Sequence, residues 1–542
     1  MKSKLIFLFL GVLILGLFLR LFQLGQTPPS LNWDEASLGY NAYTILTSGK
    51  DEHGEVLPLD RFIAFGDFKP PGYIYAAVPS IFIFGPNDFA VRFPSAVAGF
   101  FLIIVAFLLT NELTGSKKAA LFASFLTAVD PYTVHFSRAA FEANLAAALN
   151  AFAVYFFLVS RRKNIFLPVS FIFFILSFYT FNANRIIAPL LLGFLLIYYF
   201  RSTFKNWRWL IFSIIISLIL IFPSIRFLTD RESRVRFQEV SIFNNLDIIK
   251  TSNQRIALEN NSPVAKFIFN RRILYALDFA KHATDNLNPR FIFIDGDPNP
   301  RLSVDGVGLL YIFEIPFLLI GIYQLIVKKR NSAILIFFWA AIALIPAGTA
   351  KETPHALRTI SILPIYQMIS AFGIFISFLY IKLKSPKIYF PTALLFTLIV
   401  MGSIYYYLHM YFIHYPLKWP DQWQYGYKQM VDYVLKNENK YQHVYVTPDY
   451  GRPYIYFAFY KPYSLDEFIT NRQASRDWFG FWTVSKLGKV NFDIPNHLPT
   501  TGKILVVTQG DIPSEFRPLS SIKDPEGNIV FQFSERKWKK LL

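Results

Sequence analysis

The sequence of 542 residues contains no cysteine. It can therefore form neither a disulfide framework nor a metal site with thiolate ligands. The glycine-rich G-x-G-x-x-G turn and the P-loop are missing as well, and the eight histidines show neither H-E-x-x-H nor another metal-binding spacing. These absences exclude disulfide-rich scaffolds and give no support to a nucleotide-dependent enzyme.

Charged residues are scarce, at 17% of the chain, whereas hydrophobic residues make up 54% and the mean hydropathy is +0.35. A soluble chain of this length would split into domains rather than bury so much apolar surface. Phe supplies 59 residues and Tyr 30, as expected where side chains face lipid and aromatic rings line the membrane interfaces. The composition predicts a polytopic membrane protein.

Apolar runs long enough to cross the hydrocarbon core predict about eleven transmembrane helices, several interrupted by Gly or Pro. They lie near 5–24, 92–110, 119–135, 142–160, 165–181, 185–200, 209–225, 306–326, 332–349, 357–380 and 388–410. The predicted fold class is an all-α polytopic membrane protein with a C-terminal extracytoplasmic α/β domain.

Basic residues at every second junction between these helices indicate the orientation. They are Lys2 and Lys4; Lys117 and Lys118; Arg161, Arg162 and Lys163; Arg201, Lys205 and Arg208; Lys328, Lys329 and Arg330; and Lys382, Lys384 and Lys387. Glu112 is the main acidic exception. We expect a multi-pass protein of the plasma membrane with a cytoplasmic N-terminus. The net charge of +18 then reflects membrane topology rather than a nucleic-acid partner.

Three long segments lie outside the cytoplasm in this topology, namely 25–90, about 226–304, and 411–542. We therefore expect a transmembrane catalytic module over 1–410 and an extracytoplasmic domain over 411–542. In the latter the pattern predicts a helix at Tyr427–Leu435, strands at Val444–Val446, Ile504–Val507 and Ile529–Phe533, and a helix or aromatic segment at Pro453–Tyr460. The nearby Trp419, Trp423, Tyr425 and Tyr427 either stack on sugars or lie in the membrane interface.

The first outer segment contains the most informative motif. It reads Asn32-Trp33-Asp34-Glu35-Ala36 and continues as a helical pattern that ends at Gly49, with Leu38, Ala42, Ile45 and Leu46 on one face. This pattern predicts an amphipathic helix lying on the membrane, with two acids at its N-terminus. The alternative interpretation is that both acids only complement the helix dipole.

Cations stand at the predicted outer ends of several helices. Lys69 precedes Pro70-Pro71, and the others are Arg92, Arg138, Arg185 and Arg358. Such residues either bind an anionic group such as a phosphate or extend to the interface as snorkelling side chains.

The order of these motifs is similar to that of a known family. W-D-E-A, K-P-P and F-G-x-x-x-x-A-V-R-F-P-S-A are followed by Ser137-Arg138-Ala139-Ala140-Phe141-Glu142 and, more loosely, by Thr353-Pro354-His355-Ala356-Leu357-Arg358. Together they resemble the GT-C glycosyltransferases that use polyprenyl-phosphate sugars, which include protein O-mannosyltransferases and lipid A aminoarabinose transferases. The resemblance covers about the first 200 residues well and the rest loosely.

The resemblance implies roles for individual residues. Asp34 matches the catalytic base, Glu142 matches a second acidic position, and Glu35 is expected to orient Asp34 or to hold the backbone. Lys69, Arg92, Arg138 and Arg358 are the candidates for binding the donor phosphate. Apart from the resemblance, His282 and His355 lie in the expected outer loops and are weaker candidates for contacting the acceptor or a metal ion.

The sequence is compatible with a divalent metal ion as a cofactor, and no other cofactor is expected. In the aminoarabinose transferases an acid directly precedes the lysine and helps to bind metal, whereas here Phe68 has that position and Asp67 lies one residue earlier. Asp295-Gly296-Asp297 has the D-x-D form of a metal site, but the neighbouring Pro298 and Pro300 favour a polar turn.

The sequence thus predicts a membrane glycosyltransferase with a polyprenyl-phosphate-linked sugar as donor and a lipid, glycan or protein as acceptor. A transporter or lipid flippase is the alternative, although such proteins place ionisable residues along a path through the membrane. A non-catalytic scaffold would leave the D-E and K-P-P motifs unexplained.

Overall fold

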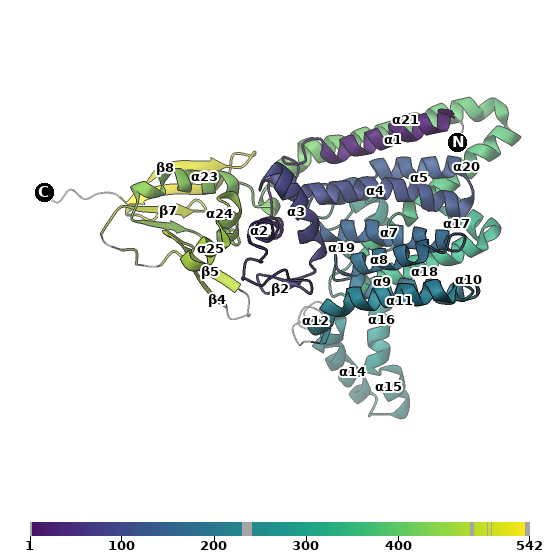
Figure 1. Cartoon of the computed structure of the whole chain (residues 1–542), viewed down its shortest axis with the longest axis horizontal. Coiled ribbons are helices and arrows are strands. Elements are labelled where there is room, and N and C mark those ends of the chain that lie inside the picture. The colour runs from purple at the N-terminus through teal and green to yellow at the C-terminus, as the bar shows by residue number, and fades with distance from the viewer. Residues whose placement is uncertain (1–2, 230–240, 477–481, 496, 500, 537–542) are drawn as a thin grey trace. The chain divides into compact units, whose positions relative to one another are not determined.

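The structure, a computed structural model, describes residues 3–229, 241–476, 482–495, 497–499 and 501–536 (Figure 1). Its contacts divide the chain into two compact units. The helical unit comprises Met1–Arg20, Val97–Ser137 and Phe141–Leu408, and the mixed unit comprises Leu21–Ala96, Arg138–Ala140 and His409–Leu542. The first long loop is therefore grouped with the C-terminal residues and not with the helices that flank it in the sequence. Part of the second expected outer segment, 230–240, lies outside the described residues.

Long apolar helices dominate the helical unit. Seven helical stretches of the described chain are long and apolar enough to cross a membrane. They are α1 (Ser3–Leu21), α4 (Asp88–Thr114), α7 (Glu142–Ser160), Trp207–Phe227 with α11 (Trp207–Ile221), α18 (Arg330–Gly348), α20 (Ile365–Lys384) and Pro386–Lys418 with α21 (Pro386–His409). Shorter apolar helices are α8 (Phe166–Phe178) and α9 (Asn184–Tyr198) in the same unit and α3 (Gly72–Phe84) in the mixed unit. The chain is thus a multi-pass membrane protein, while the number of eleven spans stays a prediction.

The remaining helices of this unit are shorter. They are α5 (Lys117–Val129), α6 (Pro131–Ser137), α10 (Phe200–Phe204), α12 (Ile225–Thr229), α14 (Leu246–Leu258), α15 (Pro263–Ile268), α16 (Arg271–Asp285), α17 (Glu314–Lys328) and α19 (Ala356–Thr359). Small residues allow close packing in the bundle, and α7 buries Ala143, Ala147 and Ala151.

Three predicted helices are wrong in their extent. The helix expected over 306–326 begins only at Glu314, as α17. The helix expected over 119–135 is divided at Asp130, because Pro131 lacks an N–H group and holds the preceding residue in an extended conformation, with ψ of 140°. The helix expected over 357–380 begins as the short α19, and α20 starts only after Pro364. The helix expected over 142–160 is confirmed to the residue as α7.

The mixed unit begins with α2 (Trp33–Ser48), the hairpin of β1 (Phe62–Ala64) and β2 (Asp67–Lys69), and α3. Its C-terminal part contains α22 (Tyr415–Lys418), α23 (Tyr427–Asn437), α24 (Pro453–Tyr460) and α25 (Leu465–Asn471) beside a sheet (Figure 1). The strands are β3 (His443–Val446), β4 (Arg472–Arg476), β5 (Trp482–Leu487), β6 (Val490–Asn491), β7 (Ile504–Thr508), β8 (Phe516–Lys523) and β9 (Ile529–Arg536).

The described sheet has seven strands in the order β4-β5-β6-β3-β7-β9-β8. Strand β3 runs parallel to β6 and β7, and the other neighbours are antiparallel. The central β7 is an apolar run that is buried over Ile504–Val507, whereas the edge strands β4 and β8 are mostly exposed and carry polar and basic residues. The predicted α/β domain is confirmed, and each of the five elements expected within it is present.

Candidate active site

Helix α2 presents the acidic motif at its first turn. Asn32 caps the helix: its Oδ1 accepts the N–H of Glu35 at 2.9 Å, and Glu35 Oε2 accepts the N–H of Asn32 at 3.2 Å. This reciprocal capping box fixes the start of the helix, and Gly49 ends it at a φ of 69°. The predicted helix with its two N-terminal acids is confirmed.

The expected exposed face of this helix is absent. Every residue from Glu35 to Ala42 is buried, so the described part of α2 is packed on all sides along these two turns. The packing is tight at Gly39, where an added Cβ would come within 2.6 Å of Phe459 and of Val91. Helix α2 is therefore an internal support of the mixed unit and not an amphipathic surface helix.

Asp34 and Lys69 form an ion pair at the head of α2. The distance from Lys69 Nζ to Asp34 Oδ1 is 3.1 Å, and the Asp34 side chain is 40% exposed whereas that of Lys69 is 12% exposed. Lys69 is the last residue of β2 and lies opposite Phe62 of β1 in the hairpin. Pro70 and Pro71 then connect β2 to α3. The structure thus brings together the two residues that the motifs single out, with the carboxylate on the open side.

Glu35 is surrounded by N–H donors. Its Oε1 accepts from Arg92 Nε at 3.0 Å and from the backbone N–H of Ala140 at 2.8 Å. Its Oε2 accepts from Arg92 Nη2 at 3.1 Å in addition to the N–H of Asn32. The carboxylate of Glu35 therefore ties the start of α2 to α4 and to the short segment 138–140.

Arg92 has all five of its N–H groups engaged. Besides Glu35, it donates to the carbonyl oxygens of Leu24 at 3.2 Å, of Pro28 at 2.7 Å, and of Ser30. The side chain is fully buried, and its guanidinium lies over the ring of Trp423. This arrangement makes Arg92 a structural clamp, so it does not support the expectation that Arg92 binds a phosphate.

Arg138 is also buried in this cluster. It donates from Nε to Tyr411 Oη at 3.3 Å and from Nη2 to the carbonyl of Thr27 at 3.1 Å, and it lies over the rings of Tyr411 and Phe412. Tyr411 was not singled out by the sequence, because its position in an apolar helix carries no signal. Trp423 and Tyr427 are fully buried, so these two rings neither stack on a sugar nor face the membrane interface, the two alternatives that the sequence left open.

The other predicted residues belong to the helical unit. Glu142 is the first residue of α7. Arg358 in α19 donates to the carbonyl of Glu352 at 2.9 Å and lies 3.7 Å from its carboxylate. His282 Nδ1 is 2.7 Å from the carbonyl of Ala350. Burial, together with the charge of Arg358, lowers the pKa of His355 to about 3, so this imidazole is neutral near pH 7.

The D-x-D motif forms a structural turn. Gly296 has a φ of 71°, and the two acids have separate partners: Asp295 pairs with Arg290 at 2.9 Å, whereas Asp297 accepts the N–H of Ala356 at 2.6 Å. Burial raises the pKa of Asp297 to about 6, although the hydrogen bonds that its carboxylate accepts from the backbone N–H groups of Ala356 and Asn299 oppose this shift. Asp297 thus holds the chain beside His355, a role that the sequence pattern did not reveal.

In the described part of the chain, no group of three or more His, Cys, Asp or Glu residues is placed to hold a metal ion. Asp67, the acid nearest to the family's metal position, accepts the backbone N–H of Phe68 at 2.9 Å. The described residues therefore provide no set of three or more such ligands for a metal ion.

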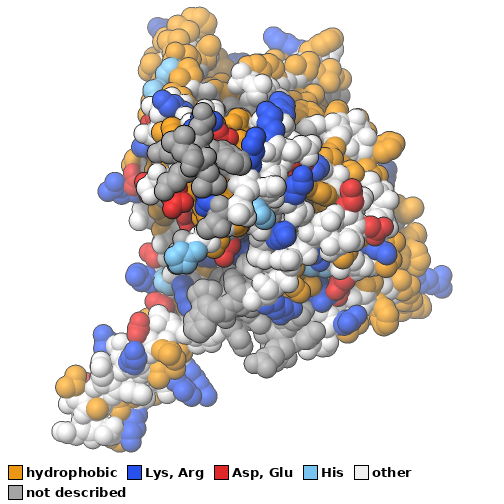
Figure 2. Space-filling view, turned by 90° about the vertical axis from the view of Figure 1, so that its left-hand side faces the viewer, with side chains coloured by type: hydrophobic (Ala, Val, Ile, Leu, Met, Phe, Trp, Pro, Cys, Tyr) orange, Lys and Arg blue, Asp and Glu red, His pale blue; other side chains and the backbone are white. Residues whose placement is uncertain are grey.

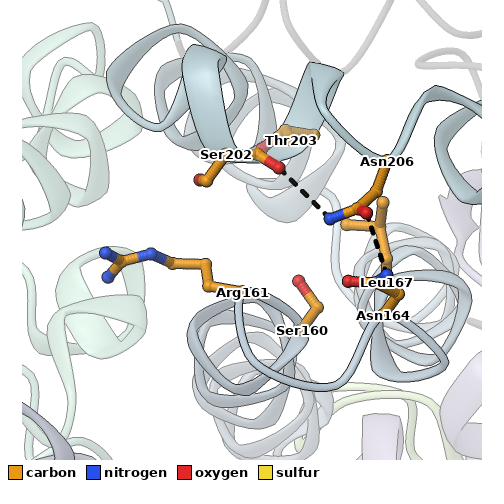
Figure 3. A pocket seen from close by; sticks show the side chains of 7 residues that line it. All are labelled: Ser160, Arg161, Asn164, Leu167, Ser202, Thr203 and Asn206. Carbon is orange, nitrogen blue, oxygen red and sulfur yellow. Dashed lines mark hydrogen bonds between the residues drawn. The ribbon is translucent and has the colours of Figure 1, made fainter.

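A small hollow lies elsewhere in the helical unit (Figure 3). It is lined by Ser160, Arg161, Asn164, Leu167, Ser202, Thr203 and Asn206. Asn164 donates to Asn206 at 2.9 Å, and Asn206 donates to the carbonyl of Ser202 (Figure 3). Since Ser160 ends α7 and Glu142 begins it, the hollow is separated from Glu142 by the length of that helix, which excludes it from a site built on Glu142.

Comparisons with known proteins agree with the motifs. Residues 68–227 match the family model described as dolichyl-phosphate-mannose-protein mannosyltransferase. No curated protein matches the chain.

Solved structures show the fold. ArnT from Cupriavidus metallidurans in the apo state has a TM-score of 0.53 at 12% identity, and its complex with undecaprenyl phosphate has 0.51 at 13%; each match covers 98% of both chains. The apo oligosaccharyltransferase of Archaeoglobus fulgidus has 0.50 at 13% and covers 84% of this chain, which spans 64% of that protein's length. The GT-C fold expected from the resemblance is confirmed.

Proposed function

We propose that this membrane protein, which shares the fold of ArnT, is a glycosyltransferase that moves a sugar from a polyprenyl-phosphate donor to a lipid, glycan or protein acceptor. The observation that carries the proposal is the ion pair of Asp34 and Lys69. It combines a partly exposed carboxylate with a nearly buried cation, 3.1 Å apart, at the head of a rigid helix. The match of residues 68–227 to a mannosyltransferase family model supports the same reaction class.

Asp34 acts as the general base in this proposal. The acceptor hydroxyl or amine attacks the anomeric carbon, the bond from that carbon to the phosphate oxygen breaks, and the acceptor proton passes to Asp34. The transition state is oxocarbenium-like, so bond breaking runs ahead of proton transfer and a weak base suffices. Its 40% exposure leaves the Asp34 carboxylate accessible to an acceptor.

Lys69 stabilises the leaving group. The polyprenyl phosphate gains negative charge as the bond breaks, and a cation aimed at that charge lowers the barrier. In the donor-free protein Asp34 neutralises Lys69. Donor binding then draws the ammonium group toward the phosphate and releases the carboxylate for its role as a base.

The buried residues of the cluster position this pair. Glu35 and Arg92 fix the first turn of α2, and Arg138 holds the carbonyl of Thr27. Arg358 remains a proposed phosphate contact, and Glu142, His282 and His355 remain proposed contacts of the acceptor or a metal ion.

The chemistry takes place on the outer face in this proposal, with the N-terminus in the cytoplasm. The support is the alternation of basic junctions along the sequence. Topology reporters fused after residues 163, 330 and 411 test it. An active cytoplasmic reporter at 411 would overturn the orientation.

The decisive experiment for the reaction is incubation of the purified protein with a panel of polyprenyl-phosphate sugars and candidate acceptors. We expect release of polyprenyl phosphate with at least one donor, and loss of that release in Asp34→Asn. Donor binding without release across the panel, with intact folding, would contradict the proposed activity.

A further inference from the structure

Helices α14, α15 and α16 form a hairpin that projects from the other helices of the helical unit (Figure 1). Each helix begins at a polar cap: the side chains of Asn245, Ser262 and Asn270 accept a backbone N–H of the following turn. Ser252 of α14 donates to the carbonyl of Phe269 at 2.6 Å, and this hydrogen bond joins α14 to the connection between α15 and α16. The hairpin is thus a formed element and not a loose loop.

The base of the hairpin is attached at the C-terminal end of α18. His282 of α16 contacts the carbonyl of Ala350 at 2.7 Å, and Ile242 donates to the carbonyl of Thr349 at 2.9 Å. Phe279 packs so closely on Gly348 that an added Cβ there would come within 2.7 Å of its ring. Because α18 is a candidate membrane span that ends at Gly348, these contacts place the base of the hairpin at the level of a membrane interface.

The far end of the hairpin is apolar and uncovered. Leu258 is 83% exposed, Phe267 74% and Val264 62%, and Ile268 is half exposed. We call these four residues the apolar tip. None of the described side chains of α16 is buried either. An apolar cluster of this kind marks a surface that is covered by a partner or by lipid.

Cations surround the apolar tip. Between residues 255 and 272 the sequence has four basic side chains, Arg255, Lys266, Arg271 and Arg272, against the single acid Glu259. Apolar and basic side chains lie side by side on the lobe at the lower left of Figure 2. This combination is typical of helices that lie in the headgroup layer, where the apolar side chains enter the acyl boundary and the cations meet anionic headgroups.

We propose that α14–α16 is a membrane anchor: its apolar tip inserts into the leaflet at the Gly348 end of α18, and its cations bind anionic lipid headgroups. The anchoring function rests on the apolar tip and its cations, none of which is a proposed contact of the donor or the acceptor; of the candidate residues only His282 belongs to α16, at the base of the hairpin. The anchor fixes the height of the adjoining loop around His355 relative to the leaflet.

The absence of cysteine from the sequence makes a site-specific test possible. Phe267→Cys in the full-length protein is labelled with an environment-sensitive fluorophore and reconstituted into nanodiscs that contain phosphatidylglycerol. A label at Glu526→Cys, in an exposed turn between β8 and β9, serves as the water-facing control. We expect strong quenching at 267 by lipid-borne nitroxides and an iodide quenching constant about threefold or more below that at 526.

A second variant tests whether the basic residues near the apolar tip bind anionic lipid headgroups. Adding Arg271→Glu and Arg272→Glu to the labelled protein should raise iodide access at 267 in phosphatidylglycerol nanodiscs and change it less in phosphatidylcholine nanodiscs. A label at 267 that iodide quenches as strongly as the label at 526, in a protein that is folded by its thermal transition, would overturn the proposal. That outcome would assign the apolar tip to a protein partner and would leave the transfer assay unaffected.

Discussion

The two ion pairs at the head of α2 involve neighbouring acids, yet their surroundings are opposite. Asp34 is 40% exposed and faces Lys69. Glu35 is buried and receives two hydrogen bonds from Arg92 and two from backbone N–H groups. Successive residues of an α-helix are rotated by about 100° around its axis, so the Asp34 side chain is partly exposed whereas that of Glu35 is buried.

The difference shows how one short motif serves both positioning and chemistry. A carboxylate that is enclosed by four donors cannot exchange partners without breaking the structure around it. The partly exposed carboxylate of Asp34 can release Lys69 at a smaller cost, because water solvates one partner of this pair. We therefore expect variants of the two acids to fail in different measurements.

The largest effect is expected for Asp34→Asn. The amide keeps the size and the position of the side chain but removes the proton acceptor, which lowers the transfer rate by about 10²- to 10⁴-fold. The thermal unfolding temperature should stay close to that of the parent, since Asp34 is not part of the buried network. Release of polyprenyl phosphate and thermal unfolding are measured on the same preparation. A folded Asp34→Asn protein with near-normal turnover would remove Asp34 from the mechanism and leave Glu142 as the better candidate.

Glu35→Gln should instead lower stability. It leaves the fully buried guanidinium of Arg92 without its counter-charge, and breaking a buried pair by removing one partner costs about 3–5 kcal/mol. Thermal unfolding in detergent measures the loss. The double variant Glu35→Gln, Arg92→Met removes the unpaired charge and should recover part of it. An unfolding temperature that is unchanged in the single variant would show that the clamp around Arg92 does not depend on Glu35.

Lys69→Ala tests the role of the cation that pairs with Asp34. A charge-assisted contact to phosphate is worth about 1.5–3 kcal/mol, so donor binding should weaken by about 10- to 100-fold. The matched control is Lys428→Ala, which removes an exposed lysine that pairs with Asp88 at 3.7 Å in the same unit. Binding of a polyprenyl-phosphate sugar is compared for both variants. Equal affinity in Lys69→Ala and the parent would restrict Lys69 to its ion pair with Asp34.

Local patterns predicted much of this arrangement. The start of α2 follows from Asn32 and Glu35, three residues apart, and the end of it from Gly49, all of which are short-range signals. Most apolar helices were predicted to within a few residues, because length and hydropathy alone define them. The motifs also singled out Asp34 and Lys69, whose side chains lie 3.1 Å apart in the structure.

Long-range contacts account for what the sequence did not predict. Helix α2 is enclosed by Val91 and Phe459, which are far away in the chain, so its periodicity resembled that of a surface helix. Arg92 is engaged by the carbonyl oxygens of Leu24, Pro28 and Ser30, and backbone carbonyls leave no trace in a residue pattern. Strands β4, β5, β6 and β8 were missed because they are short or exposed and lack an apolar run.

A second buried glutamate extends the comparison. Glu52 is buried like Glu35, but its carboxylate accepts from the amide of Asn41 at 3.2 Å, while Arg472 donates to its backbone carbonyl instead. Burial therefore raises the pKa of Glu52 from 4.5 to about 7, against the opposing hydrogen bond of Asn41. For the neighbouring His53, burial and then the charge of Arg472 lower the pKa from 6.5 to about 4.

The smallest effect is expected in the pH dependence of stability, where these two groups act in opposite directions. Folded Glu52 binds its proton more tightly than the unfolded chain does, so its contribution is present below pH 4.5 and is lost as the pH rises to about 7. His53 binds its proton less tightly when folded, so its contribution is lost as the pH falls from 6.5 to about 4. The two slopes, each at most about 1.4 kcal/mol per pH unit, largely cancel between pH 4.5 and 6.5.

Together, Glu52 and His53 should therefore leave the unfolding temperature of the parent nearly unchanged up to pH 6.5 and lower it between pH 6.5 and 7. Glu52→Gln keeps a partner for Asn41 but removes the titration, so its unfolding temperature should rise from pH 4 to 6.5 and then stay level. His53→Asn should show the reverse, a steady fall from pH 4.5 to 7. Thermal unfolding across this range measures all three proteins. Parallel curves for the parent and Glu52→Gln would mean that Glu52 takes up no proton when the chain folds, and the proposed opposition between Glu52 and His53 would fail.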